Sequence, residues 1–574
     1  MVAAVVEASE DSVVNDPQVR DFTKELVTEF QQLETDRRNW ENYWQEISEY
    51  MLPRRADFIS EYSPGEKRRN KIYEGTAVRA LTRFSSGIHN TLTNASIPWF
   101  QLTVERDLMQ DRQVQLWLEE AQRRAAMLFN SPESNFHPAA HEYYSDLGAF
   151  GTGVMMVLDM PGQGPMFRTF SLAECYLQVN YLGRVDTVFR KIKMTAKQLV
   201  EEFGIDNLSE SVVKAFTDGK QYEEFECLHV VKPRKERAFG DQSAMNMPFM
   251  SVYICPLKES HIVNVSGFET FPYVCSRWER NSQEIYGRGP GIEALADTKM
   301  LNKMEELGLK ALAKLVDPPL MVPDDGFLSP IRTTPGGLNF FRAGLSPNDR
   351  IIPLQTAGRP DLNEAKMGMV KDSINRAFYL DMLELPGPVA PDGDVLRFSA
   401  TEVNQRQRDR LSILGPIVAR QEVEFLGPLV ERTLNIMIKN RMLPDPPEAL
   451  VEANFNIEYT NPVGISMRTG ELTSVSALIQ FLIPMAQIDP NILRRLDTGR
   501  VASLAAEILR VPPSVFKTDE EIQEEIEAEA EQMARQQQLQ EQMAVAQANN
   551  LISMADRNRS QAQLANAKAA GEGA

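Results

Sequence analysis

Residues 286–319 read YGRGPGIEALADTKMLNKMEELGLKALAKLVDPP, and this stretch decides the fold. A glycine-rich run is followed by a long segment without Pro, and Asp317-Pro-Pro319 ends it. This pattern predicts a helix over about 289–316, which would be roughly 40 Å long at 1.5 Å per residue. Pro290 removes an amide that a phosphate cradle would use, so we interpret the glycine run as a turn into the helix.

Further rods and loops follow this helix. A second helix is predicted over about 361–381, roughly 30 Å long. Between the two helices, many Pro and Gly residues separate short strands, expected at 320–322, 338–342 and 350–354. After the second helix, LELPGPVAPDGDVLRF ends at Phe398 and cannot be helical, because it has three prolines and two glycines.

Ser399-Ala-Thr-Glu402 is a capping box that begins another helical stretch, which reaches about Arg441. Gly415-Pro416 and Gly427-Pro428 interrupt it, so we expect two kinks. A strand over 452–460 is predicted next. Helices then follow at about 469–482, 490–496 and 499–510. Thr518-Asp-Glu-Glu521 is another capping box and begins a last helix, expected to end near 550, in which 519–531 has acidic but no basic residues. Its apolar seam is sparse, so either copies of it join side by side as a helical tube or this part of the chain is a partly disordered tail.

The N-terminal half mixes both kinds of element. Apolar residues at helical spacing predict helices over about 17–52, 75–95, 111–130 and 138–150. Short runs rich in β-branched and aromatic residues predict strands at 99–104 and 154–158 and between about 187 and 278, with two short helices at 197–203 and 209–216. The fold class is therefore α+β, mainly helical. Residues 1–16 and 551–574 are expected to be disordered.

Composition narrows the function. The formal charge of −19 disfavours a stationary nucleic-acid binder, because affinity for DNA comes mostly from Lys and Arg. It does not exclude DNA that slides. The four cysteines are far apart and suggest neither a zinc site nor a disulfide framework, so a reduced cytosolic setting fits best. We found no signal peptide and no membrane span, and expect a soluble chain.

Catalytic motifs are missing. The chain has no Walker A, GxSxG or HExxH sequence. His137 and His141 share a helix face, but two ligands alone make a poor zinc site, so packing or capping is the better interpretation. We expect no cofactor. An enzyme would need a carboxylate pocket that sequence cannot show.

Four lysines form a stripe on the first long helix: Lys299, Lys303, Lys310 and Lys314. They lie on one face, whereas Leu301, Met304, Leu312 and Leu315 lie on another. One interpretation is a solvated face that pairs with acids such as Glu306. The other is a surface that points into a channel or toward a neighbouring subunit.

Four blocks carry a family resemblance: IYEGTAVRALTRFSSGIHNTLTNASIPWFQL (72–102), SNFHPAAHEYYSDLGAFGTGVMMV (134–157), YGRGPGIEALADTKMLNKMEE (286–306) and SATEVNQR (399–406). In content, order and spacing they resemble the portal, or head-to-tail connector, proteins of short-tailed bacteriophages. The similarity spans about residues 17–510.

The resemblance implies a homo-dodecameric ring at one capsid vertex, assembled in the host cytoplasm. Double-stranded DNA would pass through it, without sequence specificity, during packaging and ejection. Its partners would be the major capsid and scaffold proteins, the terminase large subunit and then a tail adaptor, with no membrane. The packaging motor would be another protein, and the chain would not be an enzyme.

The resemblance also divides the chain. The implied regions are a disordered arm (1–16), wing (17–285), stem helix one (286–317), clip (318–360), stem helix two (361–381), tunnel loop (382–398), kinked wing helix and strand (399–461), crown (462–515), a C-terminal helix that could form a barrel (516–550) and a disordered tail (551–574). The tunnel-loop residues are Leu385, Pro386, Gly387, Pro388, Val389, Ala390, Pro391, Asp392, Gly393 and Asp394. The clip residues expected to dock the motor or adaptor are Asp324, Asp325, Phe327, Arg332, Phe340 and Arg342.

Two other function classes stay open. A different virion protein, such as a tail-tube or scaffold subunit, is disfavoured because 150–280 is strand-rich and globular while the chain also has long paired rods. A carboxylate-based hydrolase is the third alternative. The size of the purified particle would separate these classes.

Overall fold

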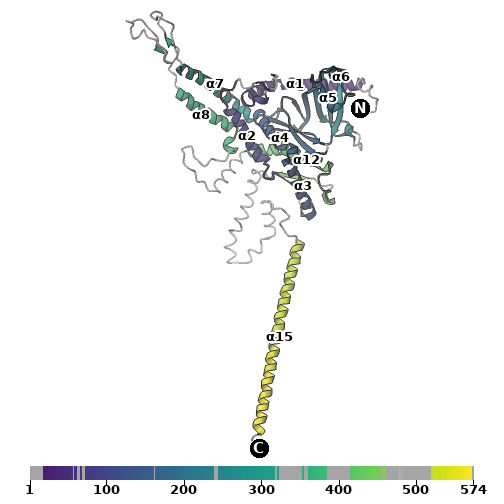
Figure 1. Cartoon of the computed structure of the whole chain (residues 1–574), viewed down its shortest axis with the longest axis vertical. Helices are drawn as coiled ribbons and strands as arrows, with labels where there is room; N and C mark the ends of the chain where they lie inside the picture. The colour runs from purple at the N-terminus through teal and green to yellow at the C-terminus, as the bar shows by residue number, and fades with distance from the viewer. Residues whose placement is uncertain are drawn as a thin grey trace. The chain divides into compact units, whose positions relative to one another are not determined.

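The computed structural model describes residues 17–55, 57–60, 65–66, 71–105, 107–160, 162–237, 243–316, 320–321, 352–353, 360–383, 414–450, 455–459, 478, 480 and 519–571. The chain divides into two units, residues 1–477 and 478–574, and each is described by itself. The first unit is a mixed helix and sheet body from which two helices extend (Figure 1). This architecture confirms the α+β class.

Helices pack around aromatic side chains in the body. Trp44, Phe84, Tyr143 and Tyr144 are fully buried, or nearly so, in one large core. The apolar spacing of three and four places them on the inner faces of their helices. These helices are α1 (Pro17–Met51), α2 (Thr76–Leu92), α3 (Arg112–Asn130) and α4 (Phe136–Phe150), in close agreement with prediction.

Two antiparallel sheets complete the body. A three-stranded sheet has the order β3-β2-β9, and a five-stranded sheet has the order β4-β5-β6-β7-β8. The N-terminal part of α1 packs Leu26 and Phe30 on the larger sheet. The strands are β2 (Thr152–Met160), β3 (Gly164–Thr169), β4 (Cys175–Val179), β5 (Val185–Thr195), β6 (Glu224–Pro233), β7 (Phe249–Ile254), β8 (Ile262–Phe268) and β9 (Tyr273–Arg277). β3 and β4 were not predicted, because each is short, with six and five residues, and β3 begins with Gly164 and Pro165.

A separate pair of strands closes the body over a long chain distance. β1 (Phe100–Thr103) pairs antiparallel with β12 (Asn456–Tyr459), and Phe100 is opposite Tyr459. Both strands were predicted, but their pairing was not.

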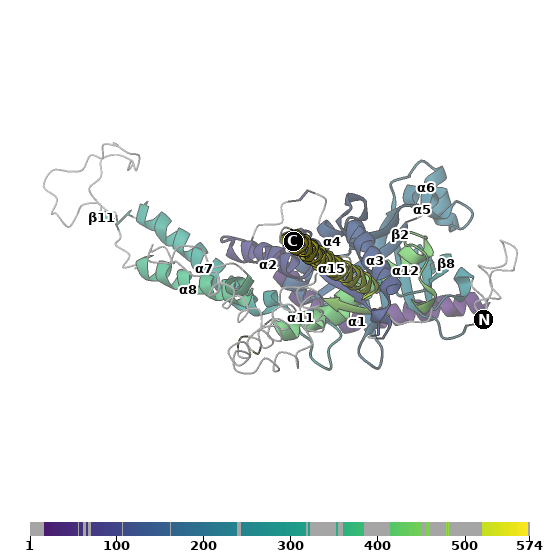
Figure 2. The same ribbon diagram turned by 90° about the horizontal axis from the view of Figure 1, so that it is seen from below.

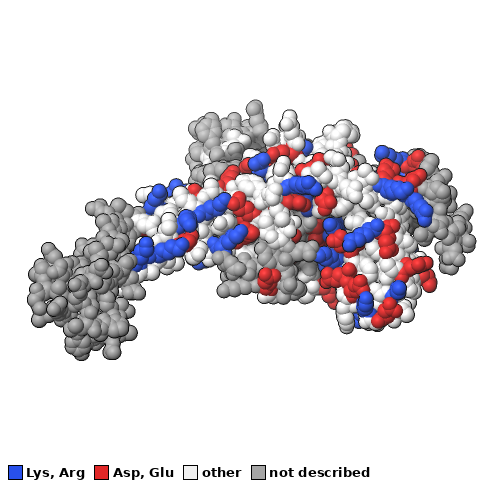
Figure 3. Space-filling model, turned by 90° about the horizontal axis from the view of Figure 1, so that it is seen from above, with Lys and Arg blue, Asp and Glu red and all other residues white. Residues whose placement is uncertain are grey.

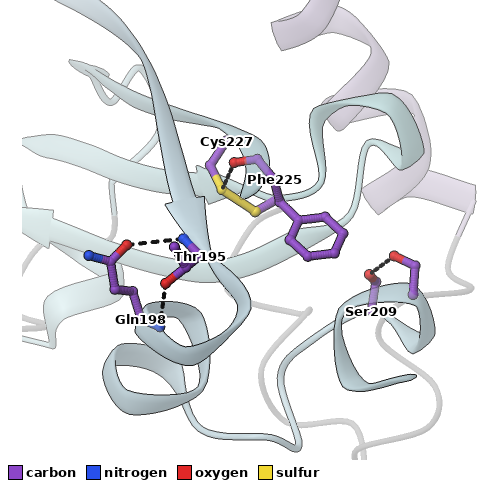
Figure 4. The surroundings of a disulfide bond; sticks show 7 residues. Thr195, Gln198, Ser209, Phe225 and Cys227 are labelled. Carbon is purple, nitrogen blue, oxygen red and sulfur yellow. Dashed lines mark hydrogen bonds between the residues drawn. A yellow bond between two sulfur atoms is a disulfide. The ribbon is translucent and has the colours of Figure 1, made fainter. Parts of the chain in front are cut away.

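The cysteine prediction was wrong. Cys227 of β6 and Cys255, directly after β7, form a disulfide (Figure 4). Leu228 pairs with Ile254 in the β6–β7 register, so the next residues outward lie opposite one another. Register is a tertiary property, which explains why a separation of 28 residues gave no signal. Cys175 and Cys275 are free and buried.

The disulfide lies beside two short helices, α5 (Ala196–Phe203) and α6 (Glu210–Thr217). Thr195 caps α5: its hydroxyl accepts from the Gln198 amide, and the Gln198 side chain accepts from the Thr195 amide (Figure 4). These reciprocal bonds satisfy two donors at the helix start.

The predicted rods are α7 (Pro290–Val316) and α8 (Pro360–Ala377), which lie side by side in both views (Figures 1 and 2). A two-stranded ladder, β10 (Leu320–Met321) and β11 (Ile352–Pro353), lies between them in the chain. The second helix is shorter than predicted. It ends at Ala377, two residues before Tyr379, whose φ is 55°, and a one-turn helix, α9 (Leu380–Leu383), follows.

Glycines fix the base of α7, as expected for a turn. A Cβ at Gly289 would lie 2.7 Å from the Leu147 carbonyl oxygen, and one at Gly291 would lie 2.5 Å from the Ala149 oxygen. The glycine run at the start of α7 therefore lies directly against the last turn of α4, where no side chain would fit.

The later helices are α11 (Gly415–Gln421), a π-helical turn, η8 (Glu422–Leu426), and α12 (Gly427–Lys439). Pro428 has no N–H, so it cannot donate to the Glu424 carbonyl as a regular α-helix would require. One residue earlier, the N–H of Gly427 donates to the carbonyl of Glu422, five residues back, which is the π-helical pattern. At the second expected kink the structure thus has a π-turn. The start of this stretch at Ser399 lies outside the described residues, as do most of the predicted crown helices.

In the second unit, α15 runs from Asp519 to Gly571. It continues past residue 550, where we expected a disordered tail to begin. The extra segment has six Ala among residues 551–571 and no Pro, and both features favour a helix up to Gly571.

Candidate functional site

The α7–α8 pair holds the lysine stripe and is the candidate site. Its inner end is fixed to the body by buried side chains of α7, among them Ala294, Leu295 and Leu301. Asn302 is also buried, and its Oδ1 accepts from the main-chain amides of Tyr73 (2.8 Å) and Glu74 (3.1 Å). The pair is therefore held rigidly where it leaves the body.

The two helices also contact each other by polar groups. Ser373 Oγ of α8 donates to Asp297 of α7 at 2.7 Å. Farther out, a Cβ added to Gly308 of α7 would lie 3.2 Å from the Asn363 side chain of α8. The missing side chain at Gly308 lets the helices approach closely.

The lysines pair with acids of the same chain. Glu306 accepts from Lys303 at 2.9 Å and from Lys310, so one carboxylate serves two amines one helical turn to either side. The lysine side chains are 63% and 64% exposed, against 18% for Glu306. Hydrogen bonds from Lys310 and then Lys303 lower the pKa of Glu306.

The remaining lysines differ. Lys299 contacts Glu46 of α1, and this hydrogen bond raises the pKa of the amine. Glu46 gave no sequence signal, because it lies far away in the chain. Lys314 is exposed and forms no ion pair with the described residues. Figure 3 shows Lys and Arg side chains along the extended pair, with Asp and Glu between them. Lys299, Lys303 and Lys310 thus pair with acids of the same chain while their amines stay largely exposed.

Charges on the two rods balance. α7 has four lysines and four acids, Glu293, Asp297, Glu305 and Glu306. α8 has Lys366, Lys371 and Arg376 against Asp361, Glu364 and Asp372. The pair is therefore neutral within a chain whose formal charge is −19.

The outer part of α7 exposes apolar side chains. Leu309, Leu312 and Val316 are 49%, 55% and 79% exposed. At 100° per residue they continue the side that buries Thr298 and Leu301 nearer the body. Leu309, Leu312 and Val316 therefore form an apolar row that the described part of the chain leaves exposed to water.

The other expected site residues lie outside the described part of the chain. These are the tunnel-loop residues Leu385 to Asp394 and the clip residues Asp324, Asp325, Phe327, Arg332, Phe340 and Arg342. Their positions stay predictions.

The histidines contact one another. His137 Nδ1 lies 3.1 Å from His89 Nε2, and its Nε2 lies 2.8 Å from Asn130 Oδ1. His141 contacts Ser86 of α2. Burial, with His137 and His141 nearby, lowers the pKa of His89 to about 4. No group of three or more His, Cys, Asp or Glu residues in the described ranges could hold a metal ion. The described helices include none long and apolar enough to cross a membrane.

Comparison with known proteins identifies the family of this chain. Residues 23–516 match the family described as bacteriophage head to tail connecting protein. The chain belongs to this family. It is 31% identical over 506 residues to the probable portal protein of Bordetella phage BPP-1, covering 87% of this chain and 89% of that protein. It is 30% identical over 552 residues to the portal protein of Salmonella phage epsilon15, covering 95% and 98%.

Membership of the connector family confirms the resemblance found in the sequence. The chain is a structural portal protein of the virion's head–tail junction, with capsid and tail partners, and not an enzyme. The rival tail-tube, scaffold and hydrolase interpretations are set aside.

Proposed function

We propose that twelve copies of this chain form a closed ring at one capsid vertex and that double-stranded DNA passes through it during packaging and ejection. In this assembly the α7–α8 pairs stand side by side around the axis. The exposed apolar row Leu309, Leu312 and Val316 carries the proposal, because a neighbouring copy would remove these side chains from water. A ring also presents both flanks of every copy to a neighbour, which a heterologous interface requires.

The charge of the rods suits a moving duplex. A wall that neutralised many phosphates would hold DNA through counterion release, with an affinity that rises steeply with the number of contacts. The rods instead have equal numbers of basic and acidic groups, and Glu306 shares its charge between two lysines. Lys303, Lys310 and Lys314 would contact phosphates briefly, and Lys299 would do so less because Glu46 holds it.

The regions follow the family division. Residues 17–285 and 399–461 would form the wing, α7 and α8 the stem, 318–360 the clip, 382–398 the tunnel loop and 462–515 the crown. The clip would dock the terminase large subunit first and the tail adaptor later, and the wing would face capsid and scaffold proteins. α15 would extend the crown as a helical barrel, with assembly taking place in the host cytoplasm.

The test is the shape of the purified protein. Negative-stain images should show rings with a central hole wide enough for a duplex, and sedimentation should give a mass near twelve chains. Leu309→Ser with Leu312→Ser should prevent ring formation without unfolding the body. Leu116→Ser, on the exposed face of α3, is the matched control and should still form rings. Compact monomers under all assembly conditions would refute the proposal.

A further inference from the structure

The Cys227–Cys255 disulfide links β6 and β7 at the open end of their hairpin (Figure 4). The ladder between these strands runs from Leu228 opposite Ile254 to Pro233 opposite Phe249, the residues that the connecting segment joins. The disulfide lies one residue beyond the Leu228–Ile254 pair. It therefore closes the end at which the two strands would otherwise be free to separate.

A separate small core covers this end of the sheet. Cys227 and Cys255 are each 1% exposed and pack with side chains of α5 and α6, among them Leu199. Phe203 of α5 also lies 5.1 Å from Tyr253 of β7 between ring centroids. Reagents reach the two sulfurs only when α5 and α6 lift from the strands. The thiols therefore oxidise slowly, and the disulfide, once formed, is protected from reduction.

The other two cysteines are unsuited to oxidation. Cys175 and Cys275 are free and buried. Burial raises the pKa of the Cys175 thiol to about 12 and raises the pKa of Cys275 well above its ordinary value. Because the thiolate is the reactive form, these two side chains stay protonated and inert at neutral pH. They provide an internal reference for the reactive pair.

The redox surroundings of a virion protein change during the life of the virus. Glutathione and thioredoxin keep thiols reduced in the cytosol, whereas disulfides persist in oxidising surroundings outside the cell. A connector protein meets both, because it is made inside the host and leaves it in the released particle. We therefore expect the state of the Cys227–Cys255 pair to follow the stage of the virus.

We propose that Cys227 and Cys255 are thiols while the particle is assembled and become a disulfide after its release, which stabilises the body of each subunit in the finished virion. The inference rests on the cytoplasmic assembly proposed above, but neither on the number of subunits nor on the path of DNA.

The oxidant in this step is a small-molecule disulfide of the surrounding medium, such as oxidised glutathione. One cysteine thiolate attacks a sulfur of this molecule and displaces one small thiol, which leaves a mixed disulfide. The second cysteine thiolate then attacks the protein sulfur of the mixed disulfide and displaces the other small thiol. Two electrons pass from the cysteine pair to the oxidant, and the two cysteine protons end on the two small thiols.

The first test measures when the disulfide forms. Infected cells and released virions are quenched in acid, and their free thiols are alkylated under denaturing conditions before peptide mass spectrometry. We expect Cys227 and Cys255 to be alkylated in cells and linked in virions, while Cys175 and Cys275 are alkylated in both. A disulfide already present in cells would overturn the proposal, and so would free thiols at both positions in virions.

The second test measures what the disulfide does in the purified full-length chain. Hydrogen exchange of the β6–β7 amides is followed with either dithiothreitol or oxidised glutathione in the buffer. We expect exchange in the oxidised protein to be slower by roughly 30-fold or more, because the disulfide disfavours opening of the loop that it closes. Cys227→Ser with Cys255→Ser should exchange at one rate in both buffers, and the matched control Cys175→Ala should keep the response.

The wild-type comparison decides the question even if a variant misfolds, because only the buffer changes. Equal exchange in the two buffers, with the linkage verified by mass spectrometry, would overturn the stabilising role. A wild-type chain that forms no rings would refute the dodecamer proposed above and leave the thiol states in cells and virions as expected, so the two failures are distinguishable.

Discussion

Arg277 and Glu424 form an ion pair that joins β9 to the π-turn. Arg277 Nη2 lies 2.7 Å from Glu424 Oε1, and Nε lies 3.1 Å from Oε2. The main-chain amide of Arg277 also donates to Oε2 at 3.0 Å. The Arg277 side chain is only 3% exposed, so it has little access to water in place of this carboxylate.

Glu424→Ala should therefore destabilise the body strongly. Removing one partner leaves a buried guanidinium without its anion, which costs about 3–5 kcal/mol. Urea unfolding followed by circular dichroism measures the loss. Lys197→Ala is the control: it breaks an exposed pair with Glu201 at 3.7 Å, and such pairs contribute about 0–1 kcal/mol. Equal losses in the two variants would contradict the assigned role.

The lysine stripe can be tested in both directions. Lys303→Ala with Lys310→Ala removes positive charge from the stem, whereas Glu306→Gln leaves both amines without their shared acid. Neither change touches a buried contact, so rings should form in both. Packaging yield or DNA retention should shift in opposite directions. Unchanged yield and retention in both variants would remove the stripe from the DNA path.

Deletion of Pro386 to Asp392 tests the tunnel loop. We expect rings in electron micrographs, because the deletion leaves the described body and stem intact, and virions that lose or fail to retain DNA. Quantification of nuclease-resistant DNA measures the effect. An absence of rings would make the segment a folding element instead.

Buried His229 predicts a pH dependence of stability. Its ring nitrogens lie 3.1 Å from the Tyr273 hydroxyl and 3.0 Å from the Ser251 hydroxyl, and burial lowers its pKa to about 3. In the unfolded chain the pKa of His229 is near 6.5, so on acidification the unfolded chain binds a proton before the folded chain does. The contribution of the neutral, buried ring to the free energy of unfolding is therefore fully present above pH 6.5 and is lost as the pH falls toward 3.

The expected loss from His229 is about 2 kcal/mol between pH 7 and pH 5. Urea unfolding at the two pH values should show it in the wild type. His229→Gln cannot titrate, so its stability should fall less over the same interval. An identical pH dependence in both proteins would show that His229 does not carry the effect.

Local pattern was sufficient to predict most elements. The bounds of α3, α4 and α7 follow from apolar periodicity and from prolines and glycines at their ends, all of which are short-range signals. Tertiary contacts account for what was missed. Tyr379 breaks α8 where Trp278, distant in sequence, packs on it, and Cys227 meets Cys255 only through strand register.

In the candidate site, too, contacts within one helix could be predicted from the sequence and contacts between distant elements could not. Helical spacing alone places the four lysines on one face and Glu306 within reach of two of them. It gives no sign of Glu46 beside Lys299, because this contact joins elements far apart in the chain.

The pairing of β1 with β12 determines when, during translation, the body of the subunit can finish folding. The Thr103 hydroxyl donates to the carbonyl of Asn456, which is 353 positions later in the chain. At ribosomal speeds of about 5–20 residues per second, β12 is therefore synthesised roughly 20–70 s after β1. Until β12 is synthesised, β1 has an unpaired edge, and α7 and α8 are made during this interval. Closure of each subunit is therefore a late event in translation, and a nascent chain stalled before residue 456 would be a target for chaperones and proteases.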